Sequence, residues 1–144
     1  MAFTLQRWLD QKGDATVVPE LRELGGAAWT TGNAAQIIET SSRKLRHIIW
    51  ELVATAAATY NIWIKLYNST GTIVSGTTEP DLVWPIEFVA GSTDLKMRGG
   101  LIWEDDLIRP TFGSGITALA SGQAGNLFTT WPANLSLHVD IGVK

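Results

Sequence analysis

The chain has no cysteine among its 144 residues. A disulfide, a thiolate metal site, a CxxC redox motif and a cysteine nucleophile are therefore excluded, and stability has to come from packing or assembly. Charged residues are scarce as well, at 17% against roughly 25% in an ordinary soluble domain. No apolar run approaches the roughly 18 residues of a membrane span, and Met1–Asp10 lacks the apolar stretch of a secretory signal. We therefore expect no membrane partner.

An excess of basic charge is also missing. The net charge is −3, from 11 basic and 14 acidic residues. Binding to nucleic acid depends on neutralising several phosphates with Lys and Arg, so we expect no nucleic-acid partner.

No group of residues has the spacing of a catalytic, cofactor-binding or metal site. The two histidines, His47 and His138, stand far apart in strand-like runs, and we interpret both as solvent-facing or locally hydrogen-bonded. Glu104-Asp105-Asp106 is the one carboxylate cluster; adjacent strand residues point to opposite faces, so we interpret it as a solvated strand end that discourages edge pairing. Gly113-Ser114-Gly115 lacks the context of a nucleophile elbow or a phosphate loop. The prediction is a protein without enzymatic activity, metal or cofactor.

Strand-like runs broken by Gly, Asn, Ser and Pro dominate the chain from residue 45 onward, a pattern typical of a sandwich or barrel. The predicted runs are Lys44–Ala54, Tyr60–Asn68, Thr72–Ser75, Leu82–Ala90, Thr93–Met97, Gly100–Leu107 and Asn134–Val143. Turn chemistry at Asn68–Gly71 favours a hairpin over 60–75, and Pro85 belongs at an edge or a bulge. The predicted fold class is all-β: a small antiparallel sandwich or jelly-roll-like barrel.

The first 44 residues have a different pattern, with short helical turns at Phe3–Gln11 and Pro19–Leu24 and many turn residues between. We predict an extended N-terminal arm over 1–44 and a β-sandwich domain over 45–144. The arm has little core of its own, and its apolar residues are the candidate capsid or subunit interface: Leu5, Trp8, Leu21, Leu24 and Trp29.

The segment Thr111–Val139 contains no Asp, Glu, Lys or Arg. Interface cores are depleted in charge, so one interpretation places this segment against another subunit. The other is a long Gly/Ser connection followed by a buried strand, and the sequence leaves both open.

Seven tryptophans are present, which is many for a chain of this size. Trp63, Trp84 and Trp103 are candidates for an exposed aromatic platform, either for stacking on sugars or for anchoring a protein partner. Core packing is the competing interpretation of each of them.

Four segments together resemble small all-β virion proteins of tailed bacteriophages. They are Leu45–Ile48, Ile62–Gly71, Val83–Ile86 and Gly100–Leu107. Two shorter matches, Thr40–Leu45 and Glu104-Asp105 followed by Leu107 and Pro110, are similar to segments of lambda-type head-decoration proteins, in which an N-terminal arm precedes a β-rich body.

The resemblance implies a structural protein of the virion, a capsid decoration or cement protein, assembled in the host cytoplasm. It implies a homotrimer on the head surface that clamps neighbouring major capsid subunits through its arm. The alternative is a carbohydrate-binding β-sandwich of a phage tail appendage that uses Trp63, Trp84 and Trp103.

Overall fold

The computed structural model describes residues 22–29, 35–128 and 130–144. Within these ranges the chain forms nine strands and one short 3-10 helix. The strands are β1 (Arg22–Trp29), β2 (Gln36–Glu39), β3 (Arg43–Ala54), β4 (Ala58–Tyr67), β5 (Leu82–Ala90), β6 (Lys96–Ile102), β7 (Thr111–Phe112), β8 (Ile116–Ser121) and β9 (Leu135–Val143), and the helix is η2 (Asp106–Ile108). The described residues contain no helix that is both long and apolar enough to cross a membrane.

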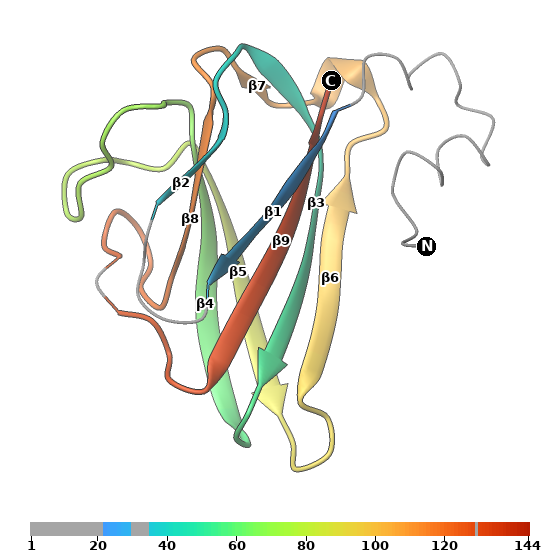
Figure 1. The fold of residues 1–144 in the computed structure, drawn as a ribbon, viewed down its shortest axis with the longest axis vertical. Coiled ribbons are helices and arrows are strands. Elements are labelled where there is room, and N and C mark those ends of the chain that lie inside the picture. The colour runs from blue at the N-terminus through green and yellow to red at the C-terminus, as the bar shows by residue number, and fades with distance from the viewer. Residues whose placement is uncertain (1–21, 30–34, 129) are drawn as a thin grey trace.

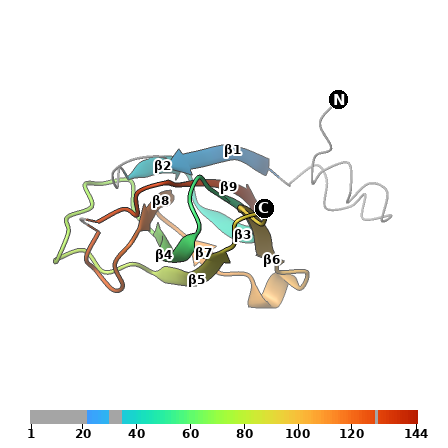
Figure 2. The same cartoon turned by 90° about the horizontal axis from the view of Figure 1, so that it is seen from below.

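The strands form two sheets that lie face to face (Figures 1 and 2). Sheet A has the order β1-β9-β3-β6, with β7 paired to the start of β3, and sheet B has the order β2-β8-β4-β5. Every pairing is antiparallel, and the described strands do not close into a barrel. The predicted all-β class is confirmed, in its sandwich form.

Alternation of apolar residues builds the core between the sheets. In β4 the side chains of Ile62, Ile64 and Leu66 are buried against sheet A, and in β9 the odd-numbered residues from Leu135 to Val143 are buried against sheet B. Successive strand residues point to opposite faces, so a two-residue period in the sequence became one apolar face in each strand. The two strands correspond to the predicted runs Tyr60–Asn68 and Asn134–Val143.

The predicted hairpin over 60–75 is wrong. Residues 72–75 form no strand, and β4 pairs instead with β5 across the long connection 68–81. The Asp81 backbone N–H donates to the Leu66 carbonyl at 2.9 Å, and the Asp81 carboxylate accepts from the Asn68 N–H at 2.7 Å. Nine residue pairs join β4 to β5, whereas a strand over the four residues Thr72–Ser75 could form at most four. The longer pairing therefore explains why the hairpin does not form. As predicted for Pro85, β5 is an edge strand.

The two predicted strands on either side of Gly99 are one continuous strand, β6. Gly99 lies opposite Trp50 in β3, and a Cβ atom on Gly99 would lie 2.3 Å from the indole Cζ2 atom. The glycine therefore makes room for a buried indole ring beside it. A Gly-Gly pair that the sequence presents as a turn is here a place of close packing within a strand.

The predicted arm over residues 1–44 needs correction in its described part. Backbone pairing joins β1 to β9 and β2 to β8, and the expected boundary at residue 44 falls inside β3. Both segments therefore belong to the sandwich, because their backbone groups complete the sheets. Residues 1–21 and 30–34 lie outside the described residues.

Two connections, 68–81 and the described residues of 122–134, cover the part of the outer face of sheet B around Lys65. They bond to each other, with Gly76 N–H donating to the Asn126 carbonyl at 2.8 Å. Beneath them Lys65 is fully buried and its ammonium donates to the Leu127 carbonyl, and burial lowers the pKa of Lys65. All of β8 is buried too. Burial within this chain therefore accounts for the absence of charge in β8. The described residues of the connection 122–134 are half-buried or exposed, so burial does not explain the lack of charge there, and both interpretations of that part stay open.

Candidate interaction site

The connection Trp103–Arg109, which follows β6, is built to hold one shape. Its centre is the single turn η2, and the Asp105 side chain caps that turn by accepting from the Leu107 backbone N–H at 2.9 Å. A carboxylate in this position satisfies a backbone N–H that the short helix leaves without a partner.

Arg109 fastens the same connection from the inside. Its side chain is only 2% exposed. The guanidinium donates to the Trp103 carbonyl at 3.0 Å, to the Glu104 carbonyl at 3.0 Å and to the Asp106 carboxylate at 3.1 Å. Three hydrogen bonds from one planar, charged group fix the path of the surrounding backbone.

Strand β3 holds the connection through Arg46, which is buried, and through Lys44. The Trp103 N–H donates to the Arg46 carbonyl at 2.9 Å, and the Arg46 guanidinium donates to the Trp103 carbonyl at 2.8 Å. Lys44 reaches the Asp106 carboxylate at 2.9 Å. The connection is thus attached to β3, an interior strand of sheet A, at Trp103 and at Asp106.

The tip of this turn presents two aliphatic side chains to solvent. Leu107 is 90% exposed and Ile108 is 64% exposed. Single exposed aliphatic residues are common, but two consecutive ones on a turn held by so many bonds are a distinct feature. We call these two residues the aliphatic tip. Such a tip is suited to insertion into an apolar pocket of a partner.

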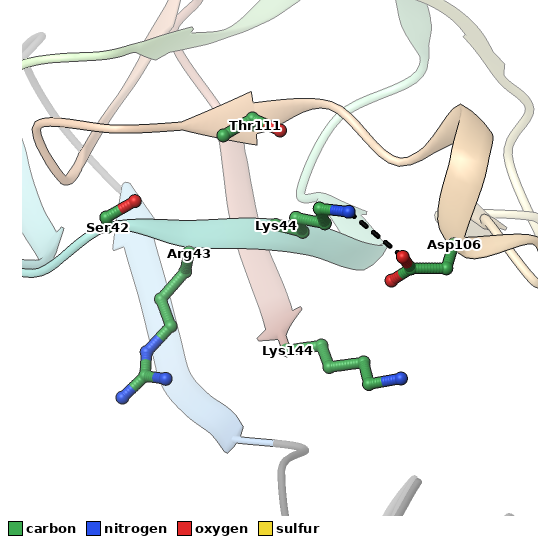
Figure 3. Close-up of a pocket in the computed structure, with 6 residues that line it drawn as sticks. All are labelled: Ser42, Arg43, Lys44, Asp106, Thr111 and Lys144. Carbon is green, nitrogen blue, oxygen red and sulfur yellow. Dashed lines mark hydrogen bonds and ion pairs between the residues drawn. The ribbon is translucent and has the colours of Figure 1, made fainter.

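A shallow pocket of about 350 Å³ lies beside the turn (Figure 3). Its lining consists of Ser42, Arg43, Lys44, Asp106, Thr111 and Lys144. Figure 3 shows the Lys44 ammonium directed at Asp106, whereas Arg43 and Lys144 extend away from that pair. The hydrogen bond from Lys44, followed by the positive charges of Lys44, Lys144 and Arg109, lowers the pKa of the Asp106 carboxyl. The aliphatic tip therefore has a locally basic flank.

The acidic cluster Glu104–Asp106 is exposed to solvent, as predicted, but it lies just beyond the strand and not within it. These residues follow β6 rather than ending a strand, and each has a local role: the Glu104 carbonyl accepts from Arg109, Asp105 caps η2, and Asp106 pairs with Lys44 and Arg109. Within the described residues, no three His, Asp or Glu side chains are arranged to hold a metal ion.

The two histidines have opposite environments. His138 is exposed and its Nε2 atom lies 3.2 Å from an Asp140 carboxylate oxygen, as predicted. His47 is fully buried, and neither ring nitrogen has a hydrogen-bond partner among the described groups, so the prediction of a solvent-facing residue is wrong. Burial, and then the charge of Arg46, lower the pKa of His47 to about 4.

The structure does not bring Trp63, Trp84 and Trp103 together as a platform. Trp63 lies on the outer face of sheet B, whereas Trp84 is opposite Ile64 and faces the core. Trp103 packs against the core from the end of β6 in sheet A. Trp63 and Trp84 point to opposite faces of sheet B because strand side chains alternate, and both Trp84 and Trp103 pack against the core. The sugar-binding alternative loses its platform with this arrangement.

The predicted arm interface lies mostly outside the described residues. This applies to Leu5, Trp8 and Leu21. Leu24 and Trp29 are in β1, where their backbone positions are opposite Ile141 and Leu137. The sequence reasoning missed the aliphatic tip, for which the available signal was two consecutive aliphatic residues between three acidic residues and Arg109-Pro110.

Fold and site together define an antiparallel β-sandwich with a rigid, apolar-tipped turn at one edge. Comparison with known proteins found no protein-family model that matches the chain and no curated protein that matches its sequence.

Proposed function

We propose that this chain is a non-enzymatic structural protein of a virion, a capsid decoration or cement protein that binds the outer surface of the head. The partner is the major capsid protein, and the contact includes the aliphatic tip, Leu107 and Ile108. The observation that carries the proposal is the exposure of these two side chains, 90% and 64%, on a turn that the rest of the chain holds in place. The resemblance to head-decoration proteins supplies the class of partner.

A rigid tip favours binding for a physical reason. Ordering a loop during association costs free energy, and here Arg109 and Lys44 already hold the turn before any partner arrives. Burying one leucine side chain contributes about 2 kcal/mol. Two neighbouring aliphatic side chains that enter one pocket therefore provide the central contact of a small interface, surrounded by the polar rim that the basic flank supplies.

The test is binding of the purified chain to heads that lack it. We expect Leu107→Asp to weaken binding at least about 30-fold, which corresponds to about 2 kcal/mol. The matched control is Val89→Asp, since Val89 is also an exposed aliphatic residue, at 67%, but lies on β5. The control should bind as the unmodified chain does. Unchanged binding of Leu107→Asp, with its fold intact by circular dichroism, would refute the role of the tip.

The contribution of the N-terminal segment needs a separate variant. Deleting residues 2–30 would remove β1 from sheet A, so the deletion should end at residue 21. We expect the shortened chain to bind heads more weakly while keeping the melting temperature of its β-sandwich. Full binding after this deletion would show that the arm does not clamp the capsid.

A further inference from the structure

We propose that two copies of this chain join edge to edge through β6, which makes one continuous sheet across a two-fold axis at Gly99. This inference is independent of the proposed function. β6 is the last strand of sheet A, and within the described residues no strand pairs with its other side. Figure 1 shows β6 along one lateral margin of the sandwich.

Backbone groups of β6 face this margin without a strand partner among the described residues. Trp103 N–H donates to the Arg46 carbonyl at 2.9 Å, and the Leu95 carbonyl accepts from Ala54 N–H at 2.7 Å. Odd-numbered residues therefore direct their N–H and C=O groups at β3. Because these directions alternate along an antiparallel strand, the even-numbered residues direct theirs at the free margin: Lys96, Arg98, Gly100 and Ile102.

The side chains of β6 are self-complementary about Gly99. A two-fold axis there places Arg98 opposite Gly100 and Lys96 opposite Ile102 of the other copy. These are pairs of even-numbered residues, as the hydrogen bonds require. Met97 then lies opposite Leu101 of the other copy in a non-hydrogen-bonded pair, where facing side chains are closest. Met97 and Leu101 thus form an apolar pair, and no cation lies directly opposite a cation.

The surface along β6 has the shape that such a contact needs. A groove of about 340 Å³ follows the strand, lined by Ile49 and residues 98–102. At Gly99 and Gly100 the Cβ positions are directed at the Trp50 ring and at the β3 backbone, so no side chain projects toward the free margin there. Leu101 is 39% exposed. The one cation in the lining, Arg98, is already paired with Glu51 of its own chain.

The edge of sheet B on the same side of the sandwich is less suited to pairing. That edge is β5, which contains Pro85, and proline has no N–H to donate. Edge-to-edge pairing on this side of the sandwich therefore extends sheet A and not sheet B. A two-fold dimer of this kind is a different assembly from the homotrimer that the resemblance implies, so the mass of the assembly distinguishes them.

The first experiment uses the absence of native cysteine. In the proposed register, a double variant with Met97→Cys and Leu101→Cys brings the new thiol at position 97 of one copy opposite the new thiol at position 101 of the other. Within one chain these positions are four residues apart on an extended strand, about 13 Å, which is too far for a disulfide. We expect oxidation to give a covalent dimer with a disulfide between positions 97 and 101, identified by peptide mass, whereas each single variant stays monomeric under denaturing conditions.

The second experiment keeps the proposal testable if the cysteine variant folds poorly. Sedimentation of the unmodified chain should give the mass of a dimer. Leu101→Glu should raise the dimer dissociation constant at least about 10-fold, and the control Val74→Glu, at an exposed aliphatic residue of the connection 68–81, should leave it unchanged. A monomer or trimer from the unmodified chain, equal cross-linking of the single variants, or a dimer indifferent to Leu101→Glu would each overturn the proposal. The binding of Leu107→Asp to heads tests the proposed function and does not test the dimer.

Discussion

His47 makes the stability of this protein depend on pH in a defined window. The side chain is fully buried in β3, and a Cβ atom on Gly142 would lie 1.9 Å from its Cε1 atom, so the ring lies directly on the Gly142 backbone. Neither ring nitrogen has a hydrogen-bond partner among the described groups. A protonated imidazole in this place would be desolvated and next to the Arg46 charge, and its pKa accordingly falls from 6.5 to about 4.

The magnitude follows from the two pKa values. A difference of about 2.5 units, at about 1.36 kcal/mol per unit, amounts to roughly 3 kcal/mol. The folded pKa is the lower one, so the unfolded chain takes up the proton first as the pH falls. The stabilisation is therefore complete above about pH 6.5, decreases between about pH 6.5 and pH 4, and makes no further change below that. Against a typical total of about 5–15 kcal/mol, this is a large loss.

The assay is urea unfolding at a series of pH values between about 7.5 and 4. We expect the free energy of unfolding of the unmodified chain to fall by roughly 3 kcal/mol over this range, beyond the slope shown by a His47→Phe variant. Phenylalanine keeps a ring over Gly142 and removes both unpartnered nitrogens, so stability at neutral pH should stay within about 1 kcal/mol of the original.

The matched control is His138→Gln, because His138 is exposed and its replacement should leave the pH dependence as it is. The lowered pKa of Asp106 adds a loss of stability only below the ordinary range of an aspartate, outside the His47 window. Equal pH dependence in the unmodified chain and in His47→Phe would refute the reasoning, as would an NMR titration of the His47 ring with a midpoint near 6.5.

Three further changes test the packing described above. Gly99→Ala places a methyl group against a buried indole ring and should lower the free energy of unfolding in urea by about 1–3 kcal/mol. The control Gly91→Ala, with no atom within 4 Å of its added Cβ, should lower it by well under about 1 kcal/mol. Similar losses for both variants would contradict the close approach of Gly99 to Trp50. Lys65→Met removes the hydrogen bond from the buried ammonium and leaves the Leu127 carbonyl with only the 3.3 Å bond from the Ser121 hydroxyl, so a loss of about 1–2 kcal/mol is expected. No change in the melting curve would show that the covering loops do not depend on the Lys65 bond. Arg109→Lys cannot make three forked hydrogen bonds; hydrogen exchange in residues 103–109 should become faster while the core strands keep their protection, and unchanged exchange there would rule out its role.

Local pattern and tertiary structure contributed differently to these results. The two-residue period of Ile62, Ile64 and Leu66 and the run Leu82–Ala90 were enough to predict β4 and β5, the second with its observed bounds. The exposed and buried faces of a strand follow from the alternation of neighbouring residues, so they can be predicted without knowing the fold. The pairing partner of a strand cannot be read from neighbouring residues. The predicted hairpin over 60–75 was wrong because β4 pairs with β5, a longer strand further along the chain.

The candidate site depended even more on the tertiary structure. Trp63 and Trp84 have similar surroundings in the sequence, but only the sheet pairing shows that one faces outward and the other the core. Burial of a charged or titratable group, as at Lys65 and His47, depends on what covers it, and the covering segments come from distant parts of the chain.

The sequence by itself determined the all-β class, the absence of thiol chemistry and most of the strand faces, because each of these depends on composition or on adjacent residues. Only the tertiary structure decided which strands are edges, which aliphatic residues remain exposed at the tip, and which polar groups are buried. Those properties arise from contacts between residues far apart in the chain, and no local period records them.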